Sequence, residues 1–352
     1  MSKATTGCAP ALHEGRPCGV PADGVAASDR KRCATPGASV AHEATRHANA
    51  EFHHHHSHAP ASHHPGRHHL LTVEDLHVGF DMYDPSASYF RAGRVQNEVL
   101  RGVTLSVHAG EMLALVGASG SGKTVLADAL MGHFEPNAFV SGRIWFDGVA
   151  QDAASLAELR GAGIALVPQG VVHLDPLMKV GRQVRGEPRG ETRSQRAVDR
   201  RRRAVRQREL FEAYGLEPEV AACYPHELSG GMARRVLLMC ALMEEPRLII
   251  ADEPTPGLDM ELAIHALDDL RAFADAGGGV LLITHDLHLA LAVADRVAVF
   301  RDGEVVEETD VASFAAPERL RHPFSRSLWH AMPEHDFTAA SQAVRVREEI
   351  NP

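Results

Sequence analysis

One stretch of the chain has the residue types and spacing that bind the phosphates of a nucleotide. It fits the pattern G-x-x-x-x-G-K-[S/T] at every fixed position, with Gly117, Ala118, Ser119, Gly120, Ser121, Gly122, Lys123 and Thr124. An apolar run before it and a helical pattern after it, starting at Val125, make a chance glycine-rich turn a weak alternative. In such a P-loop, backbone N–H groups and a helix N-terminus converge on phosphate oxygens.

Each polar side chain of this loop has an expected task. Lys123 would reach the β- and γ-phosphates, and the Thr124 hydroxyl would bind Mg²⁺. We therefore expect ATP and Mg²⁺ as cofactors, with residues 117–125 as the binding segment.

Two adjacent acids follow another buried apolar run, Leu248–Ala251. In a chain with a P-loop, Asp252 is expected to hold Mg²⁺ through water, and Glu253 to act as the general base on the attacking water. Two acids at the end of a strand are otherwise often plain surface residues. The P-loop in the same chain makes the catalytic interpretation the stronger one.

Four further motifs, in a fixed order along the chain, resemble those of the ATP-binding-cassette (ABC) ATPases. Alone, each would more often be structural, but together they span about residues 70–312 and make the resemblance specific. They are Gln169 as the Q-loop, Leu228-Ser229-Gly230-Gly231-Met232 as the signature, Pro256-Gly257-Leu258-Asp259 as the D-loop and His285 as the switch histidine. Met232 departs from the commonest signature, which has Gln, but members of the peptide and nickel branch also carry Met there.

The resemblance implies a role for each motif. Gln169 would join the Mg²⁺ ligands and sense the γ-phosphate, and His285 would hydrogen-bond that phosphate. Ser229 with the N–H groups of Gly230 and Gly231 would contact the γ-phosphate held by a second cassette, and Asp259 would couple the two sites. One chain carries one P-loop and one signature, so we expect a pair of cassettes, identical or different.

The resemblance also implies an aromatic side chain stacked on adenine. Phe80, Tyr83, Tyr89 and Phe90 all lie near the first strand and qualify. The sequence does not choose between them.

The end of the chain resembles one branch of the family. Residues 321–333 resemble the C-terminal extension of oligopeptide, dipeptide and nickel importer ATPases, and residues 174–181 resemble another stretch of that branch. No cysteine follows Cys240, which is more like the nickel or metallophore members. This implies separate permease subunits, an indirect solute-binding protein, a place on the cytoplasmic face of the cell membrane, and a nickel or metal chelate or short peptides as solute. The alternative is a soluble ABC ATPase in translation or repair, which usually has two cassettes or a long coiled-coil insertion.

The elements that must position these residues follow from the apolar pattern. Runs of apolar residues predict strands at 71–78, 99–107, 112–116, 164–167, 248–251 and 280–283, and helical spacing appears at 125–131, 236–243 and 262–274. Strands alternating with helices predict an α/β fold whose mainly parallel sheet is covered on both faces. With the family resemblance, we expect a P-loop NTPase (RecA-like) core, an antiparallel β subdomain, an inserted α-helical subdomain at about 175–235 and an extension at 313–352.

Residues 1–69 differ from the rest in composition. They are rich in Ala, Pro, Gly and His with little apolar periodicity, which predicts a disordered tail. The tail carries 12 of the chain's 23 histidines. Imidazole binds Ni²⁺, Co²⁺, Cu²⁺ and Zn²⁺, so metal buffering and a low-complexity leader both stay open. The run Arg200–Arg203 is likewise either a solvated helix face or a contact for acidic lipid or permease residues.

Composition excludes several classes of protein. The 352 residues carry a formal charge of −10, which argues against a general nucleic-acid binder, so no nucleic-acid partner is expected. The longest apolar runs are far shorter than the ~18 residues that span a bilayer, and the first thirty residues contain no secretory h-region. Five cysteines without close pairs disfavour a disulfide framework and suit the cytoplasm.

Overall fold

The computed structural model describes residues 68–83 and 94–332. The chain divides into units of residues 1–57 and 58–352, and every described residue belongs to the second unit. The tail expected at 1–69 therefore lies outside the described residues, apart from His68 and His69. His69 is already the first residue of a strand, one position earlier than the expected start of the folded domain.

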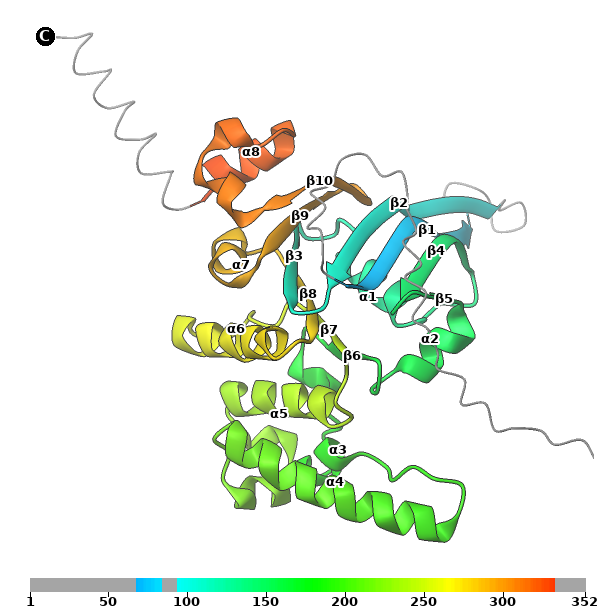
Figure 1. The fold of residues 1–352 in the computed structure, drawn as a ribbon, viewed down its shortest axis with the longest axis vertical. Coiled ribbons are helices and arrows are strands. Elements are labelled where there is room, and N and C mark those ends of the chain that lie inside the picture. The colour runs from blue at the N-terminus through cyan, green and yellow to red at the C-terminus, as the bar shows by residue number, and fades with distance from the viewer. Residues whose placement is uncertain (1–67, 84–93, 333–352) are drawn as a thin grey trace, which may run out of the picture. The chain divides into compact units, whose positions relative to one another are not determined.

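An antiparallel sheet of four strands packs beside the nucleotide-binding core (Figure 1). Its strand order is β2-β1-β4-β5, and all its pairs are antiparallel, as expected for the β subdomain. The strands are β1 (His69–Tyr83), β2 (Arg94–His108), β4 (Ala138–Phe146) and β5 (Val149–Gln151).

The second sheet has six strands in the order β10-β9-β3-β8-β7-β6. The five strands from β9 to β6 run parallel, and β10 pairs antiparallel at the edge. The strands are β3 (Glu111–Gly117), β6 (Ile164–Val167), β7 (Leu248–Asp252), β8 (Gly279–Thr284), β9 (Arg296–Arg301) and β10 (Glu304–Asp310). Because both faces are covered, the central strands are apolar at most positions, and this pattern predicted β3, β6, β7 and β8. It did not predict β9, although five of the six residues of β9 are buried.

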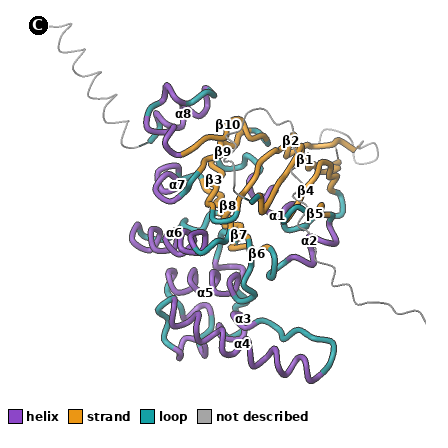
Figure 2. Tube along the Cα trace, viewed as in Figure 1, coloured by secondary structure: helices purple, strands orange, loops and turns teal. Residues whose placement is uncertain are grey.

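Helices flank this sheet, and three of them form the subdomain inserted between β6 and β7 (Figure 2). The inserted helices are α3 (Val180–Arg185), α4 (Arg193–Ala213) and α5 (Gly230–Leu242); the others are α1 (Lys123–Leu130), α2 (Ala153–Leu159), α6 (Met260–Asp275), α7 (Leu287–Val293) and α8 (Pro323–His330). Short 3₁₀ turns lie at 171–173, 218–222, 225–227, 311–315 and 317–319. The predicted fold class is confirmed. Within the described ranges no helix has both the length and the apolarity to cross a bilayer.

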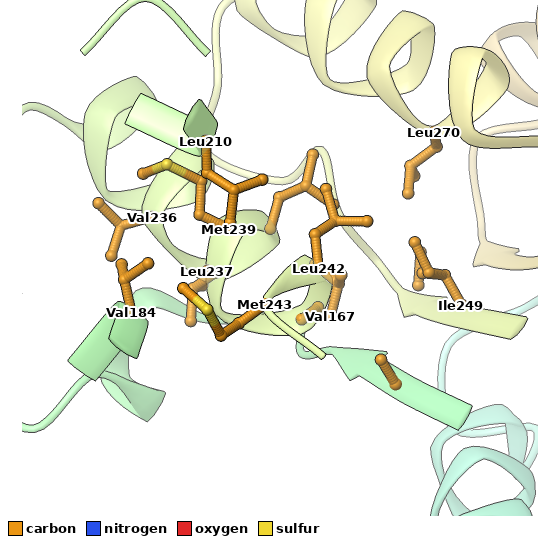
Figure 3. Close-up of a cluster of buried hydrophobic side chains, with 14 of the residues drawn as sticks. Val167, Val184, Leu210, Val236, Leu237, Met239, Leu242, Met243, Ile249 and Leu270 are labelled. Carbon is orange, nitrogen blue, oxygen red and sulfur yellow. The ribbon is translucent and has the colours of Figure 1, made fainter. Parts of the chain in front are cut away.

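Alternate residues of the central strands enter two different cores, as the pleat of a strand requires. On β7, Ile249 and Ala251 join the core formed with α5 and α6, and Leu248 and Ile250 join the core formed with α1 and the antiparallel sheet. Figure 3 shows the first of these cores, with Val236 and Met239 of α5 among its labelled side chains. The inserted helices are thus packed onto the parallel sheet through α5.

The described part of the C-terminal extension packs against β9 and α7. Phe314 and Leu320 are buried beside Val297 and Val299 of β9. The Trp329 Nε1–H donates to the Phe314 carbonyl oxygen at 2.8 Å. Residues 313–332 therefore extend the core of the cassette, and residues 333–352 lie outside the described residues.

Candidate functional site

The P-loop connects β3 to α1, and two of its glycines sit where a side chain would not fit. A Cβ on Gly117 would lie 2.2 Å from the Phe300 carbonyl oxygen of β9. Gly122 caps α1 with φ of 106°, in the left-handed region that favours glycine. Ala118, Ser119 and Gly120 are exposed. The loop is therefore held by neighbouring strands on one side and open on the other, as phosphate binding requires.

Lys123 lies at the base of this loop and is buried. Its ammonium donates to the carbonyl oxygens of Gly117 and Ala118, each at 2.9 Å. Burial lowers the pKa of Lys123, and the charges of Glu253 and Asp252 act in the opposite direction. The Lys123 ammonium therefore lies close enough to the two predicted acids for their charges to act on its pKa.

Asp252 ends β7 and offers a carboxylate oxygen to a cation. It is buried, and its Oδ1 has no hydrogen-bond partner. Burial raises the pKa of Asp252, while a hydrogen bond with the Thr124 side chain lowers it. A carboxylate and a hydroxyl are the oxygen ligands that Mg²⁺ prefers, so these residues fit the predicted ion.

Glu253 and His285 come together because β7 and β8 are neighbours in the sheet. The Glu253 Oε2 lies 2.5 Å from the His285 Nδ1. Glu253 has a φ of 49°, an uncommon value for a residue with a side chain, and its N–H donates to the Ile283 carbonyl of β8 at 2.8 Å. The Glu253 side chain is nearly buried and that of His285 is 53% exposed. The Glu253 carboxylate is held in a fixed position, as a general base must be, and the imidazole beside it is accessible from outside.

The signature and D-loop residues form a second group at the N-termini of α5 and α6. The Ser229 hydroxyl caps α5 by accepting from the Met232 N–H at 3.3 Å, and the Asp259 carboxylate caps α6. Ser229, Gly230 and Asp259 are exposed, whereas a Cβ on Gly231 would lie 2.9 Å from Leu262 of α6. Among the described residues, neither Ser229 nor Asp259 hydrogen-bonds to the P-loop or to the acids of β7. The structure thus separates the predicted residues into two groups.

Gln169 belongs to neither group and lies in the loop after β6. Its side chain is exposed and hydrogen-bonds to no described residue, but its carbonyl oxygen accepts from the Arg234 guanidinium at 2.6 Å. Arg234 is a buried residue of α5 that sequence reasoning missed. The only signal in the sequence was its position two residues after the signature, which says nothing about the segments that it contacts.

Two of the four aromatic residues predicted as candidates for stacking on adenine, Phe80 and Tyr83, lie in the described part of the chain. Phe80 of β1 lines a cavity of about 530 Å³ together with Val125 of α1. Tyr83 is the last residue of β1, while Tyr89 and Phe90 lie outside the described residues. Of the four candidates for stacking on adenine, Phe80 is the one that the structure places beside α1, the helix that follows the P-loop.

Comparison with known proteins identifies the family. A family profile described as ABC transporter matches residues 100–256. The oligopeptide transport ATP-binding protein OppD of Lactococcus lactis subsp. cremoris (strain SK11) is 37% identical over 263 residues, covering 70% of this chain and 74% of that protein. OppD of Bacillus subtilis (strain 168) is 39% identical, with 75% and 72% covered. The glutathione import ATP-binding protein GsiA of Escherichia coli (strain K12) is 34% identical over 75% of this chain and 42% of that protein.

Solved structures agree with this similarity. A dimeric ATP-binding cassette in a post-hydrolysis state with ADP and Pi is 26% identical, with a TM-score of 0.56 and coverage of 69% of this chain and 99% of that chain. The structure of an ATP-binding subunit of an ABC transporter is 28% identical, with a TM-score of 0.56 over 74% of this chain and 98% of that chain. With the P-loop and the acids of β7 in the arrangement described above, the chain belongs to the family of ABC transporter ATP-binding proteins and is an ATP-binding, ATP-hydrolysing cassette.

Proposed function

We propose that this chain energises an importer of short peptides, as a peripheral subunit on the cytoplasmic face of the cell membrane. The observation that supports it is the similarity, over more than 70% of their lengths, to proteins named for oligopeptide transport. GsiA, named for glutathione import, is a further relative of the same kind. The soluble alternative, an ABC ATPase in translation or repair, is not favoured by these relatives.

Hydrolysis in this proposal uses the residues of the first group. Lys123 and the loop N–H groups bind the phosphates, and Glu253 takes the proton from the attacking water. His285 hydrogen-bonds the γ-phosphate through the accessible side of its ring. Asp252, Thr124 and Gln169 would hold Mg²⁺, which, when bound, supplies positive charge to the phosphate oxygens.

The second group serves a second cassette. The N-terminus of α5 is exposed at Ser229 and Gly230, while Gly231 is buried behind them. A helix N-terminus is a geometry that binds anions. In the proposed dimer these residues contact the γ-phosphate on the other cassette, and Asp259 joins the two sites. The dimeric cassette among the related structures supports a pair of this kind.

Permease subunits would dock beside the Q-loop. Val171 and Val172, which follow Gln169 closely, are exposed, and so is Leu177, at 87%. Apolar side chains gathered on one exposed segment are typical of a protein contact. Docking there would place the transmembrane partner next to the residue proposed to sense ATP.

A metal chelate is the second candidate for the solute. The observation that favours it is the density of histidines in residues 1–69, because imidazole is a common ligand of nickel and related ions. Its support is weaker than that for peptides, because the tail lies outside residues 100–256, the range matched by the ABC transporter family profile.

The test is transport by the complete system in proteoliposomes. The chain, its permeases and its binding protein are reconstituted, and ATP hydrolysis is measured with short peptides or with Ni²⁺ chelates. We expect peptides to stimulate hydrolysis and Glu253→Gln to abolish the stimulation. Stimulation by the chelate alone would replace the peptide proposal with the metal one.

A further inference from the structure

The guanidinium of Arg234 is a buried cation that no described carboxylate neutralises. Two other buried arginines have such partners: Arg203 pairs with Asp199, and Arg296 pairs with Glu111. Arg234 is 6% exposed and its Nε has no hydrogen-bond partner. Burial lowers its pKa. Since an unpaired buried charge costs stability, a role in stability alone is a poor explanation for this residue.

The hydrogen bonds of Arg234 join two loops that are far apart in the sequence. Its Nη1 donates to the carbonyl oxygens of Pro168 at 3.2 Å and Gln169 at 2.6 Å. Its Nη2 donates to the carbonyl oxygen of Pro256 at 3.1 Å. The first loop carries the residue proposed to sense ATP, and the second leads to Asp259. The planar fork of arginine can bind both loops at once, which the single nitrogen of lysine cannot do in the same way.

The helix that carries Arg234 begins at the signature. Gly230 is the first residue of α5, and Arg234 lies about one turn further along the same helix. One side chain therefore connects the Q-loop, the D-loop and the helix whose N-terminus is proposed to meet a second cassette. Arg234 also lines a cavity of about 410 Å³ together with Pro254 and Leu258, which flank the bonded Pro256 in sequence.

We propose that Arg234 is a positioning residue that transmits the state of the Q-loop to the D-loop and to the signature helix. ATP on this chain's own P-loop thereby prepares the surfaces that receive the second cassette. The inference rests on the proposed role of Gln169 and goes beyond it, because it names the link between the two groups of residues.

Arg235 provides a matched control on the same helix. Its Nη1 donates to the carbonyl oxygens of Tyr214 at 2.8 Å and Gly215 at 3.3 Å, just after the end of α4. Arg235→Gln therefore removes a guanidinium that binds backbone carbonyls within the inserted helices. It leaves the bonds to the Q-loop and D-loop in place.

The test is hydrogen exchange on the full chain, with and without ATP and Mg²⁺, in a Glu253→Gln background that prevents turnover. In that background we expect ATP to slow amide exchange in both 169–175 and 257–262. When Arg234→Gln is added, the ATP-dependent slowing at 169–175 should remain. The ATP-dependent slowing at 257–262 should become about five-fold smaller, which is the change expected from the loss of one hydrogen bond. Arg235→Gln should leave both responses as they were.

A second variant, Arg234→Lys, tests whether the positive charge alone is enough or whether hydrogen bonds to both loops are needed. It also provides a test if Arg234→Gln does not fold. Lysine keeps the positive charge but not the fork, so we expect the response at 257–262 to stay weak. Full ATP-dependent slowing at 257–262 in Arg234→Lys or in Arg234→Gln would overturn the inference about Arg234 and leave the proposed function untouched. No ATP-dependent slowing at 169–175 in the starting protein would overturn the role of Gln169, and the inference with it.

Discussion

At the scale of single residues, the two acids of β7 differ in what surrounds them. Asp252 has a buried oxygen without a partner, whereas Glu253 is bonded to His285. Asp252, the last residue of β7, is arranged to accept a cation, and Glu253, the residue directly after the strand, is held in a fixed direction beside an imidazole. Two neighbouring carboxylates are thereby suited to different tasks, metal binding and proton transfer.

Glu253→Gln should separate binding from hydrolysis. The amide keeps the size of the side chain but cannot take a proton from water, so turnover should fall roughly 10²-fold or more, the usual scale for a positioned base. The P-loop is unchanged, so ATP affinity should stay close to that of the wild type. Both are measured on one preparation, by nucleotide titration and by phosphate release; near-normal turnover would remove Glu253 from this role.

At the scale of elements, a buried ionic network ties the two sheets together. Glu111, the first residue of β3, is fully buried; it accepts from the His108 N–H of β2 at 2.8 Å and from the Arg296 guanidinium of β9 at 3.0 Å. Arg296 also pairs with Glu308 of β10. Burial by itself would raise the pKa of Glu111, but the hydrogen bond with the His108 side chain, whose Nδ1 lies 2.5 Å from the Glu111 Oε2, and the charge of Arg296 outweigh burial and lower the pKa to about 2.

This network predicts acid sensitivity. The folded pKa of Glu111 lies below the ordinary glutamate value of 4.5, so its stabilisation is complete above about pH 4.5 and is lost as the pH falls toward 2. The shift corresponds to a stabilisation on the order of 3 kcal/mol. Glu111→Gln should therefore unfold at lower urea concentration at pH 7, and its deficit should shrink below pH 4.5. Glu304→Gln, at an exposed position of β10, is the control, and a deficit independent of pH would contradict the assignment.

The N-terminus of α5 carries the next prediction. Ser229→Arg puts a long cation at an exposed helix start, so it should block contact with a second cassette while leaving the P-loop intact. In the Glu253→Gln background, sizing with ATP should show a dimer that Ser229→Arg removes, alone or mixed with a second cassette protein. Ser229→Ala is the comparison: it removes the hydroxyl, with its cap worth about 1 kcal/mol and its proposed phosphate contact, but adds no cation, so it should weaken the dimer less than Ser229→Arg. A fully active monomer would contradict the paired arrangement.

At the scale of the whole molecule, the histidine-rich segment and the cassette are predicted to act independently. The His68 Nε2 lies 2.5 Å from the Asp147 Oδ1, and the His69 ring lies against the His108 ring at a tilt of 48°, so these two histidines belong to the fold. Removing residues 1–67 should keep the ATPase rate and lose most Ni²⁺ binding. Because neutral imidazole is the ligand, Ni²⁺ affinity of the full chain should fall below pH ~6.5. Unchanged Ni²⁺ stoichiometry in the shortened chain would remove the support for a metal solute.

The sequence by itself determined the local motifs. A P-loop depends on residues close together in the chain, and the central strands are legible because burial on both faces makes them continuously apolar. By the same reasoning β4 and β10 were not predicted individually: β4 has four exposed residues in a row, and β10 is a charged edge strand. The strand β9 was not predicted either, although it is buried, and exposure does not explain that case.

Only the tertiary structure decided which distant segments meet. The contact between Glu253 and His285 follows from the order of β7 and β8 in the sheet, and the described place of Phe80 follows from how β1 packs beside α1. Arg234 is the clearest case, since its position after the signature gives no sign of the Q-loop and D-loop carbonyls that it binds. Motifs depend on neighbours along the chain, whereas these contacts depend on strand order and helix packing, which no short spacing encodes.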